Sequence, residues 1–133
     1  MDVVLIIGRV LFSLIFIGSG AAGHFAQVDG TTGYAEMRGV KNGRILVQLS
    51  GALLILIAVG VIAGIWIDLA ALLAIAWLLV ANVMVHHFWN DTDAMMRQIE
   101  MTNFMKNLSM AGGALIMFAL ADQMGPTITD PLF

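Results

Sequence analysis

The longest apolar stretch of the chain covers residues 45–85 and holds a single charged side chain, Asp68, near its middle. At about 1.5 Å per residue, a helix of that length would extend about 60 Å, twice the roughly 30 Å thickness of the hydrocarbon core of a bilayer. The pattern therefore predicts two membrane-spanning helices, at about residues 45–67 and 69–88, joined by a turn at Asp68.

Two weaker apolar segments flank this pair. Residues 3–22 contain one charge, Arg9, and residues 104–121 contain one charge, Lys106. Lipid cannot satisfy backbone hydrogen bonds, so spans of this length form helices, whereas the strands of membrane barrels are alternating segments of about 10 residues. We therefore expect an all-α integral membrane protein, with one domain over residues 1–133 that forms a four-helix transmembrane bundle.

The composition supports a membrane protein and narrows the chemistry. Hydrophobic residues make up 60% of the chain and charged residues 11%, too few charges for the surface of an ordinary soluble domain. The first apolar run is too long for a signal peptide and has no basic residue before it, so we expect it to be retained. The lipid bilayer is thus the first expected partner.

Several kinds of site are absent from the sequence. The chain has no cysteine, which excludes disulfides, thiol catalysis, iron–sulfur clusters and thiolate zinc sites. It also lacks a phosphate-binding glycine loop, a nucleophile elbow and a basic patch for nucleic acid. With three histidines, of which two are adjacent, we expect no intrinsic haem or metal site and no intrinsic cofactor.

The basic residues indicate an orientation. Five of the six lie in or beside the first and third connections, namely Arg38, Lys41, Arg44, Arg97 and Lys106. Basic residues favour the cytoplasmic side, so we expect a multi-pass protein of the inner (plasma) membrane with both long connections in the cytoplasm and both termini outside.

Both long connections carry helix signals. Glycines surround residues 34–38 in the first connection, which predicts a short interfacial helix. The second connection begins with residues 90–93, whose side chains are good helix caps, and is predicted to continue as a helix into the fourth span.

Polar side chains gather at the expected cytoplasmic boundary. On a continuous helix, Asn82, His86 and Trp89 would share one face, and His24 would close a similar stripe that begins at Arg9. Polar groups inside a bilayer are costly, so we expect Arg9 to face the bundle as an intramembrane charge. The candidate site for contact with quinone or lipid comprises His24, Gln48, His86, Trp89, Asn103, Lys106 and Asn107. No catalytic residue is identified. The alternatives are that Lys106 only snorkels and that Trp89 is an interfacial anchor.

Four motifs carry a family resemblance. They are Gly8-Arg9-Val10-Leu11, Gln48-Leu49-Ser50-Gly51, His86-His87-Phe88-Trp89, and Phe104-Met105-Lys106-Asn107-Leu108 followed by Gly112-Gly113. In this order they resemble the DoxX family of small four-span membrane proteins, over nearly the whole chain. The resemblance implies a redox setting, because relatives include membrane subunits of thiosulfate:quinone oxidoreductase and proteins that associate with superoxide dismutase and a sulfurtransferase.

From this resemblance we expect an accessory or anchoring subunit of a membrane redox or respiratory complex, in contact with quinone or bound lipid. The expected partners are other membrane subunits or further copies of this chain. The alternatives are a quinone-reducing subunit of a thiosulfate:quinone oxidoreductase-like enzyme, and a structural scaffold or assembly factor.

One departure from the family pattern favours the accessory role. Relatives commonly have Glu before the glycine of the second span, where this chain has Gln48, so an ion pair with Lys106 would become a hydrogen bond. The remaining carboxylates near the candidate site are expected on loops, which weakens the case for quinone proton chemistry.

Overall fold

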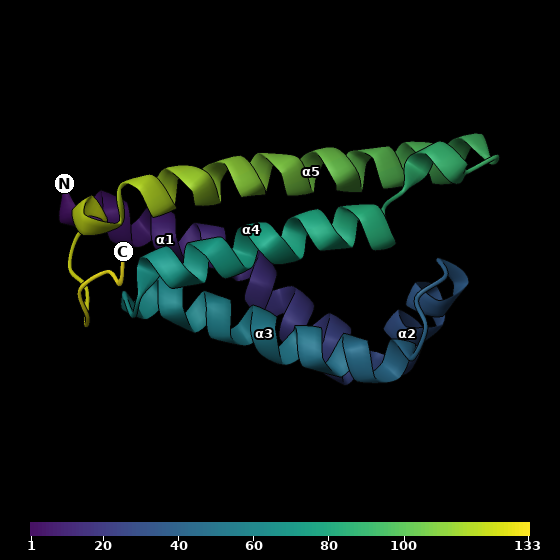
Figure 1. Ribbon diagram of the computed structural model, residues 1–133, viewed down its shortest axis with the longest axis horizontal. Helices are drawn as coiled ribbons and strands as arrows, with labels where there is room; N and C mark the ends of the chain where they lie inside the picture. The colour runs from purple at the N-terminus through teal and green to yellow at the C-terminus, as the bar shows by residue number, and fades with distance from the viewer.

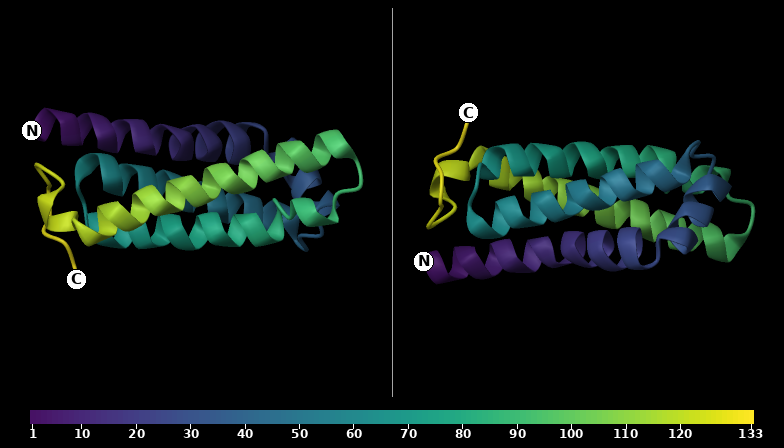
Figure 2. Two further views of the ribbon diagram at one scale, coloured as in Figure 1. Left: turned by 90° about the horizontal axis from the view of Figure 1, so that it is seen from above. Right: turned by 90° about the horizontal axis from the view of Figure 1, so that it is seen from below.

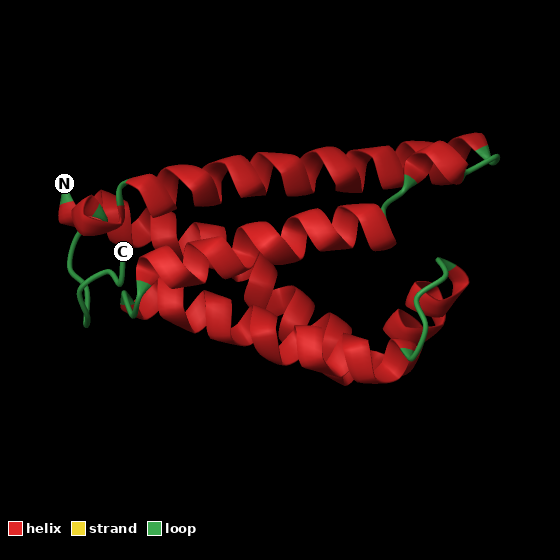
Figure 3. Ribbon diagram, viewed as in Figure 1, coloured by secondary structure: helices red, strands yellow, loops and turns green.

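The structure is a computed structural model that describes all residues, Met1–Phe133. Its elements are the helices α1 (Asp2–Ile17), α2 (Val28–Met37), α3 (Gly43–Ala63), α4 (Ile67–Met84) and α5 (Ala94–Ala119), the π-helix η1 (Gly18–Ala26), and the short 3₁₀ helices η2 (Phe88–Asn90) and η3 (Ala121–Gln123). There is no strand (Figure 3). The prediction of an all-α membrane bundle is confirmed.

Four long helical segments lie side by side along the molecule (Figure 1). Three are long and apolar enough to cross a membrane, at Asp2–Ala26, Gly43–Ala63 and Ile67–Asn90. The fourth, α5, packs along α4 and crosses the bundle obliquely (Figure 2). That residues 104–121 of α5 form a fourth span stays a prediction.

The two long connections lie at one end of the bundle and the two termini at the other (Figure 1). The first connection contains α2, as the glycine pattern predicted, and Gly39 with a φ of +94° lies in the turn after it. The second leads into α5, where the Asp93 side chain caps the helix by accepting a hydrogen bond from Met96 N at 2.8 Å. The capping prediction is therefore confirmed.

Small residues and a few large ones fill the centre of the bundle. Ala71 and Ala74 of α4 and Ala114 of α5 are fully buried, and they let the two backbones approach closely. Leu54 and Leu78 are also fully buried. Large apolar side chains on every long helix point outward instead, which suits a surface in contact with lipid; they include Leu11, Leu56, Val83 and Ile116.

Two glycines bring η1 against α3. A Cβ at Gly20 would lie 2.9 Å from the Gly51 carbonyl oxygen, and a Cβ at Gly51 would lie 2.6 Å from the Cβ of His24. Neither position has room for a side chain, so the two segments touch backbone to backbone. This contact fixes where His24 stands.

The turn between α3 and α4 differs from the expected one. It uses Gly64 and Trp66, both with positive φ, and Asp68 lies after it in the first turn of α4. There the buried Asp68 carboxylate accepts hydrogen bonds from the backbone of Leu132 at 2.5 Å and of Phe133 at 2.7 Å. Asp68 therefore anchors the C-terminal segment instead of forming the turn.

Helix α4 ends earlier than expected, at Met84. The prediction that Asn82, His86 and Trp89 share a face of one continuous helix is therefore wrong. The physical reason is a tertiary contact: Nε of Arg38, the residue that follows α2, donates to the Val85 carbonyl oxygen at 2.7 Å and satisfies the end of α4.

Candidate functional site

A cavity of about 430 Å³ lies near the connection end of the bundle. Its walls come from α1, η1, α2, α3, α4 and α5, and most of the lining side chains are apolar, among them Phe16, Leu54 and Met110. Four of the predicted site residues line it: His24, His86, Lys106 and Asn107. Tyr34, Ser19 and Trp77 add polar atoms that the sequence analysis did not select.

The other three predicted residues lie outside the cavity lining. Gln48 is exposed on α3, and Trp89 is half exposed and packs edge-on against the ring of Phe104. The Asn103 Oδ1 accepts from Lys106 Nζ at 3.4 Å. The expected hydrogen bond between Lys106 and Gln48 is not formed, because α5 packs along α4 and not along α3.

His24 owes its position to the π-helix. A π-helix relates each residue to the carbonyl five positions earlier, and His24 is five residues after Ser19. Its Nδ1 lies 2.7 Å from the Ser19 carbonyl oxygen. The ring is buried and meets Trp77 edge to face, with 6.2 Å between centroids.

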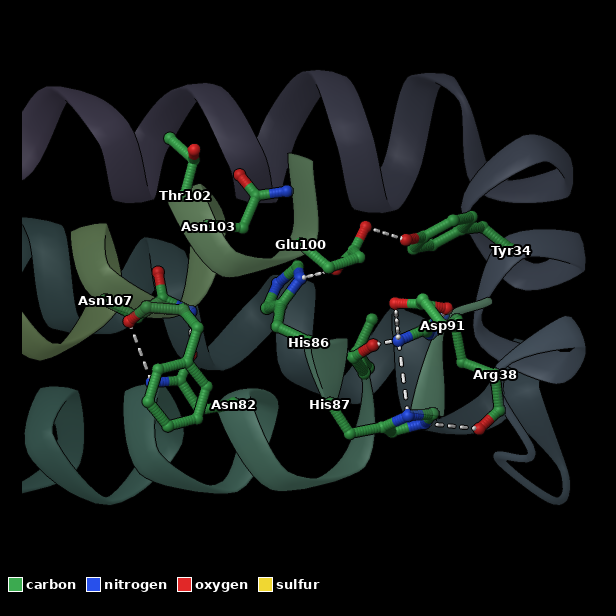
Figure 4. A network of polar contacts seen from close by, with 12 residues as sticks. Tyr34, Arg38, Asn82, His86, His87, Asp91, Glu100, Thr102, Asn103 and Asn107 are labelled. Carbon is green, nitrogen blue, oxygen red and sulfur yellow. Dashed lines mark hydrogen bonds and ion pairs between the residues drawn. The ribbon is translucent and has the colours of Figure 1, made fainter. Parts of the chain in front are cut away.

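His86 belongs to a network that the sequence analysis missed (Figure 4). Its Nδ1 lies 2.6 Å from Glu100 Oε2, while Glu100 Oε1 accepts a hydrogen bond from the Tyr34 hydroxyl. The Glu100 side chain is 2% exposed and stands on α5. The expectation that carboxylates near the site lie only on loops is therefore wrong, since α5 begins ten residues before the predicted span at residue 104.

Burial and the negative charge of Glu100 raise the pKa of the Tyr34 phenol well above its ordinary value. Tyr34 therefore stays protonated and acts as a donor to Glu100. A sequence signal for Glu100 did exist, since it lies seven residues before Asn107 and so on the same face of α5. Tyr34 and Glu100 join α2 to α5 across this end of the bundle.

An ion pair between Arg38 and Asp91 lies beside this network. Arg38 Nη1 is 2.5 Å from Asp91 Oδ1, and Arg38 Nη2 is 3.2 Å from Asp91 Oδ2. The hydrogen bond from Arg38 holds the pKa of Asp91 below its usual value, and the same bond raises the pKa of Arg38. His87 contacts Arg38 and not the cavity, so the adjacent histidines serve different clusters.

Two buried amide side chains, Asn82 and Asn107, join α4 to α5. Asn82 Nδ2 donates to the Phe104 carbonyl oxygen at 3.0 Å, and Asn107 Nδ2 donates to Asn82 Oδ1 at 2.9 Å (Figure 4). A backbone carbonyl can only accept, so it fixes the orientation of Asn82 and, through it, that of Asn107.

The amino-acid sequence was compared with known families, curated proteins and solved structures. The DoxX family model matches residues 4–87, well over half of the chain, and the match ends at His87, before α5 begins. No curated protein and no solved structure matches the chain. The matched region contains the Arg9 and Gln48 motifs of the resemblance and the first two residues of the His86 motif, while the Lys106 motif lies outside it. The protein is a member of the DoxX family.

Proposed function

We propose that the protein is an accessory subunit of a membrane redox assembly and that its cavity binds the headgroup of a quinone. The observation that carries this proposal is a cavity of about 430 Å³ with mostly apolar walls and a few polar side chains among them. Sites for small molecules commonly measure about 300–1,000 Å³ and combine apolar walls with a few placed polar groups. A quinone offers the matching shape, a flat ring with oxygens at opposite edges and an apolar tail.

The polar atoms of the cavity suit such a ring. The Lys106 ammonium and the Trp77 indole N–H are donors for a quinone oxygen, and the imidazoles of His24 and His86 offer ring nitrogens. Phe16 and other apolar lining side chains would contact the ring and the tail. When bound, the quinone would supply the electron-carrying chemistry, and the protein would supply binding and orientation.

The connections favour an accessory role. Polar residues at this end are already used in packing, because Tyr34 of α2 pairs with Glu100 of α5, and Arg38 after α2 pairs with Asp91 before α5. We therefore propose that electrons come from a partner subunit that docks at this end. Basic residues at the same end support its assignment to the cytoplasmic side of the inner membrane, with the termini outside and residues 104–121 as the fourth span.

The binding part is tested with the purified protein in lipid nanodiscs and a short-chain ubiquinone, through quenching of tryptophan fluorescence. Ala81→Phe adds a ring to a residue that lines the cavity, whereas Ala76→Phe adds the same ring to an exposed position on the same helix. We expect Ala81→Phe to abolish quenching and Ala76→Phe to leave it unchanged. Equal quenching in both variants would place the quinone elsewhere, and a copurified lipid in the cavity would make lipid the ligand.

The accessory part is tested in native membranes. We expect the protein, extracted in a mild detergent, to migrate in a larger complex whose members are identified by mass spectrometry. Donor-dependent quinone reduction by the isolated chain, lost in His86→Ala, would make it the quinone-reducing enzyme instead. Migration as a single inactive chain would refute the accessory role, and it would also count against the scaffold alternative, because no partner would be bound.

A further inference from the structure

We propose that the cavity binds the reduced, hydroxyl-bearing quinol in preference to the oxidised quinone, because His24 and His86 are both held in the tautomer that leaves Nε2 without a hydrogen. This inference rests on the proposed function, since it names which form of the ligand the same cavity selects. It follows from the hydrogen bonds that each ring makes on its other nitrogen.

The tautomer of His24 is set by a backbone carbonyl. Its Nδ1 lies 2.7 Å from the Ser19 carbonyl oxygen, and a carbonyl oxygen can only accept. Nδ1 must therefore carry the hydrogen. In a neutral imidazole the other nitrogen, Nε2, is then an acceptor.

The tautomer of His86 is set by Glu100. The raised pKa of Tyr34 keeps its phenol protonated, so Glu100 Oε1 accepts from it, and Oε2 of the same carboxylate lies 2.6 Å from His86 Nδ1. An ionised carboxylate only accepts, so Nδ1 of His86 carries the hydrogen. Nε2 of the neutral ring is again an acceptor.

His87 shows the opposite arrangement and serves as an internal contrast. Its Nε2 faces the Arg38 carbonyl oxygen at 3.2 Å and must donate, while its Nδ1 faces the Arg38 guanidinium at 3.2 Å and must accept. The local hydrogen-bond partners thus set the tautomer of each histidine separately. Only His24 and His86, the two histidines that line the cavity, present Nε2 as an acceptor.

The two acceptor atoms are accessible. Neither Nε2 has a hydrogen-bond partner in the protein, and both rings line the cavity. The buried side-chain polar atoms without a partner are Ser13 Oγ, Thr32 Oγ1 and Asp68 Oδ1. The Nε2 atoms of His24 and His86 are not among them, so a ligand in the cavity can reach both.

Other groups in the lining add acceptors. Asn107 donates one Nδ2 hydrogen to Asn82, which leaves its Oδ1 as an acceptor and its second Nδ2 hydrogen as a donor. The hydroxyls of Thr31 and Ser50 donate to backbone carbonyls, at 2.6 Å and 2.9 Å, and so have only lone pairs left to offer. The lining also includes side chains that can donate, namely the Lys106 ammonium, the Trp77 indole and the Ser19 hydroxyl.

A quinol suits this mixture better than a quinone does. Each quinol hydroxyl both donates and accepts, so it can pair with an imidazole and with Lys106 or Trp77. A quinone oxygen can only accept and leaves the imidazoles of His24 and His86 unpaired. An unpaired buried acceptor weakens binding on the order of tenfold. A tenfold preference for the two-electron reduced form would raise the midpoint potential of the bound quinone by about 30 mV.

The first measurement needs no ligand. Nitrogen-15 NMR distinguishes the two tautomers of a neutral imidazole, and we expect His24 and His86 to carry hydrogen on Nδ1 and His87 on Nε2. In Glu100→Gln the amide oxygen would still accept from Tyr34, and the amide NH₂ would donate to His86 Nδ1, which moves the ring hydrogen to Nε2. Glu36→Gln is the matched control, because it makes the same substitution at an exposed carboxylate that does not line the cavity.

The second measurement compares the dissociation constants of decylubiquinol and decylubiquinone under anaerobic conditions. It is made at about pH 8, above the range in which an imidazole in water takes a second proton. We expect wild type and Glu36→Gln to bind the quinol on the order of tenfold or more tightly than the quinone, and Glu100→Gln to lose about tenfold of that preference.

The outcomes separate this inference from the proposed function. Equal binding of both forms, or hydrogen on Nε2 of His86 in the wild type, would overturn the preference and leave quinone binding intact. If neither form binds, the proposed function fails and the preference fails with it. If Glu100→Gln does not fold, the wild-type spectrum and the wild-type ratio of dissociation constants decide the inference.

Discussion

Arg9 offers the sharpest test of how the terminal end of the bundle is held. The side chain is 2% exposed and contacts no carboxylate; its guanidinium donates instead to backbone carbonyls. Nε bonds the Val61 oxygen at 2.7 Å, Nη2 bonds the Ile62 oxygen at 2.6 Å, and Nη1 bonds the Pro126 oxygen at 2.6 Å. The first two carbonyls lie in the last turn of α3, where the helix leaves its acceptors free.

The size of the effect follows from these three short bonds. Arg9→Met keeps the length of the side chain and leaves three carbonyls without a donor, at roughly 1 kcal/mol each or about 3 kcal/mol in all. A chain of this size loses roughly 3–4 °C per kcal/mol, so we expect the melting temperature to fall by about 10 °C. Arg9→Lys should recover only part of the loss, because an ammonium cannot reach both α3 and the C-terminal segment.

The assay is thermal unfolding of the purified variants in one detergent, followed by circular dichroism. Arg44→Met is the matched control, because Arg44 pairs with Asp29 on the surface, where the two side chains are 58% and 86% exposed. Such a pair contributes less than about 1 kcal/mol. If Arg9→Met and Arg44→Met melt within about 3 °C of each other, the bonds of Arg9 do not hold the bundle together.

Three further predictions concern the opposite end. Tyr34 is the only tyrosine, so phenolate absorbance reports its ionisation alone. We expect little ionisation at about pH 10 in the folded protein and ionisation at lower pH in Glu100→Gln. The folded protein should lose stability as the pH rises above about 10, because the unfolded chain then releases the phenol proton more readily than the folded one. Gly51→Ala should displace His24, whose Cβ would lie 2.6 Å from the new methyl group, and should weaken quinone quenching with the helix content unchanged. Asp91→Asn should speed proteolysis of the second connection at neutral pH, and wild type should approach that rate as acid protonates the carboxylate below its ordinary pKa.

The sequence predicted the features that depend on local pattern. Long apolar runs gave the helices, glycines around residues 34–38 gave α2, and a capping residue gave the start of α5 at Asp93. Four residues of the candidate site, including His24 and His86, do line one cavity. These features could be predicted because they follow from the periodicity of apolar residues and from the cost of polar groups in lipid.

The missed features depend on contacts between distant segments. Glu100 looked like a surface residue of a connection because α5 extends well beyond the apolar run, and its burial depends on Tyr34, 66 residues away. Gln48 is predicted in the site as a polar residue near the expected cytoplasmic boundary, yet it faces outward because helix packing directs α5 toward α4. No periodicity in a single sequence encodes which helices become neighbours.

The two ends of the bundle use buried charge in different ways, and this difference supports the proposed ligand site at the connection end. At the terminal end, Arg9 is held by backbone carbonyls, which cannot exchange a proton at any ordinary pH. At the connection end, Glu100 is held by a phenol and an imidazole, whose rings border the cavity. The proposed quinol, whose hydroxyl groups gain and lose hydrogen, would therefore find suitable partners at the connection end. At the terminal end, the bonds of Arg9 hold α1, α3 and the C-terminal segment together. At the connection end, η1, α2, α4 and α5 bring the partners of the cavity together.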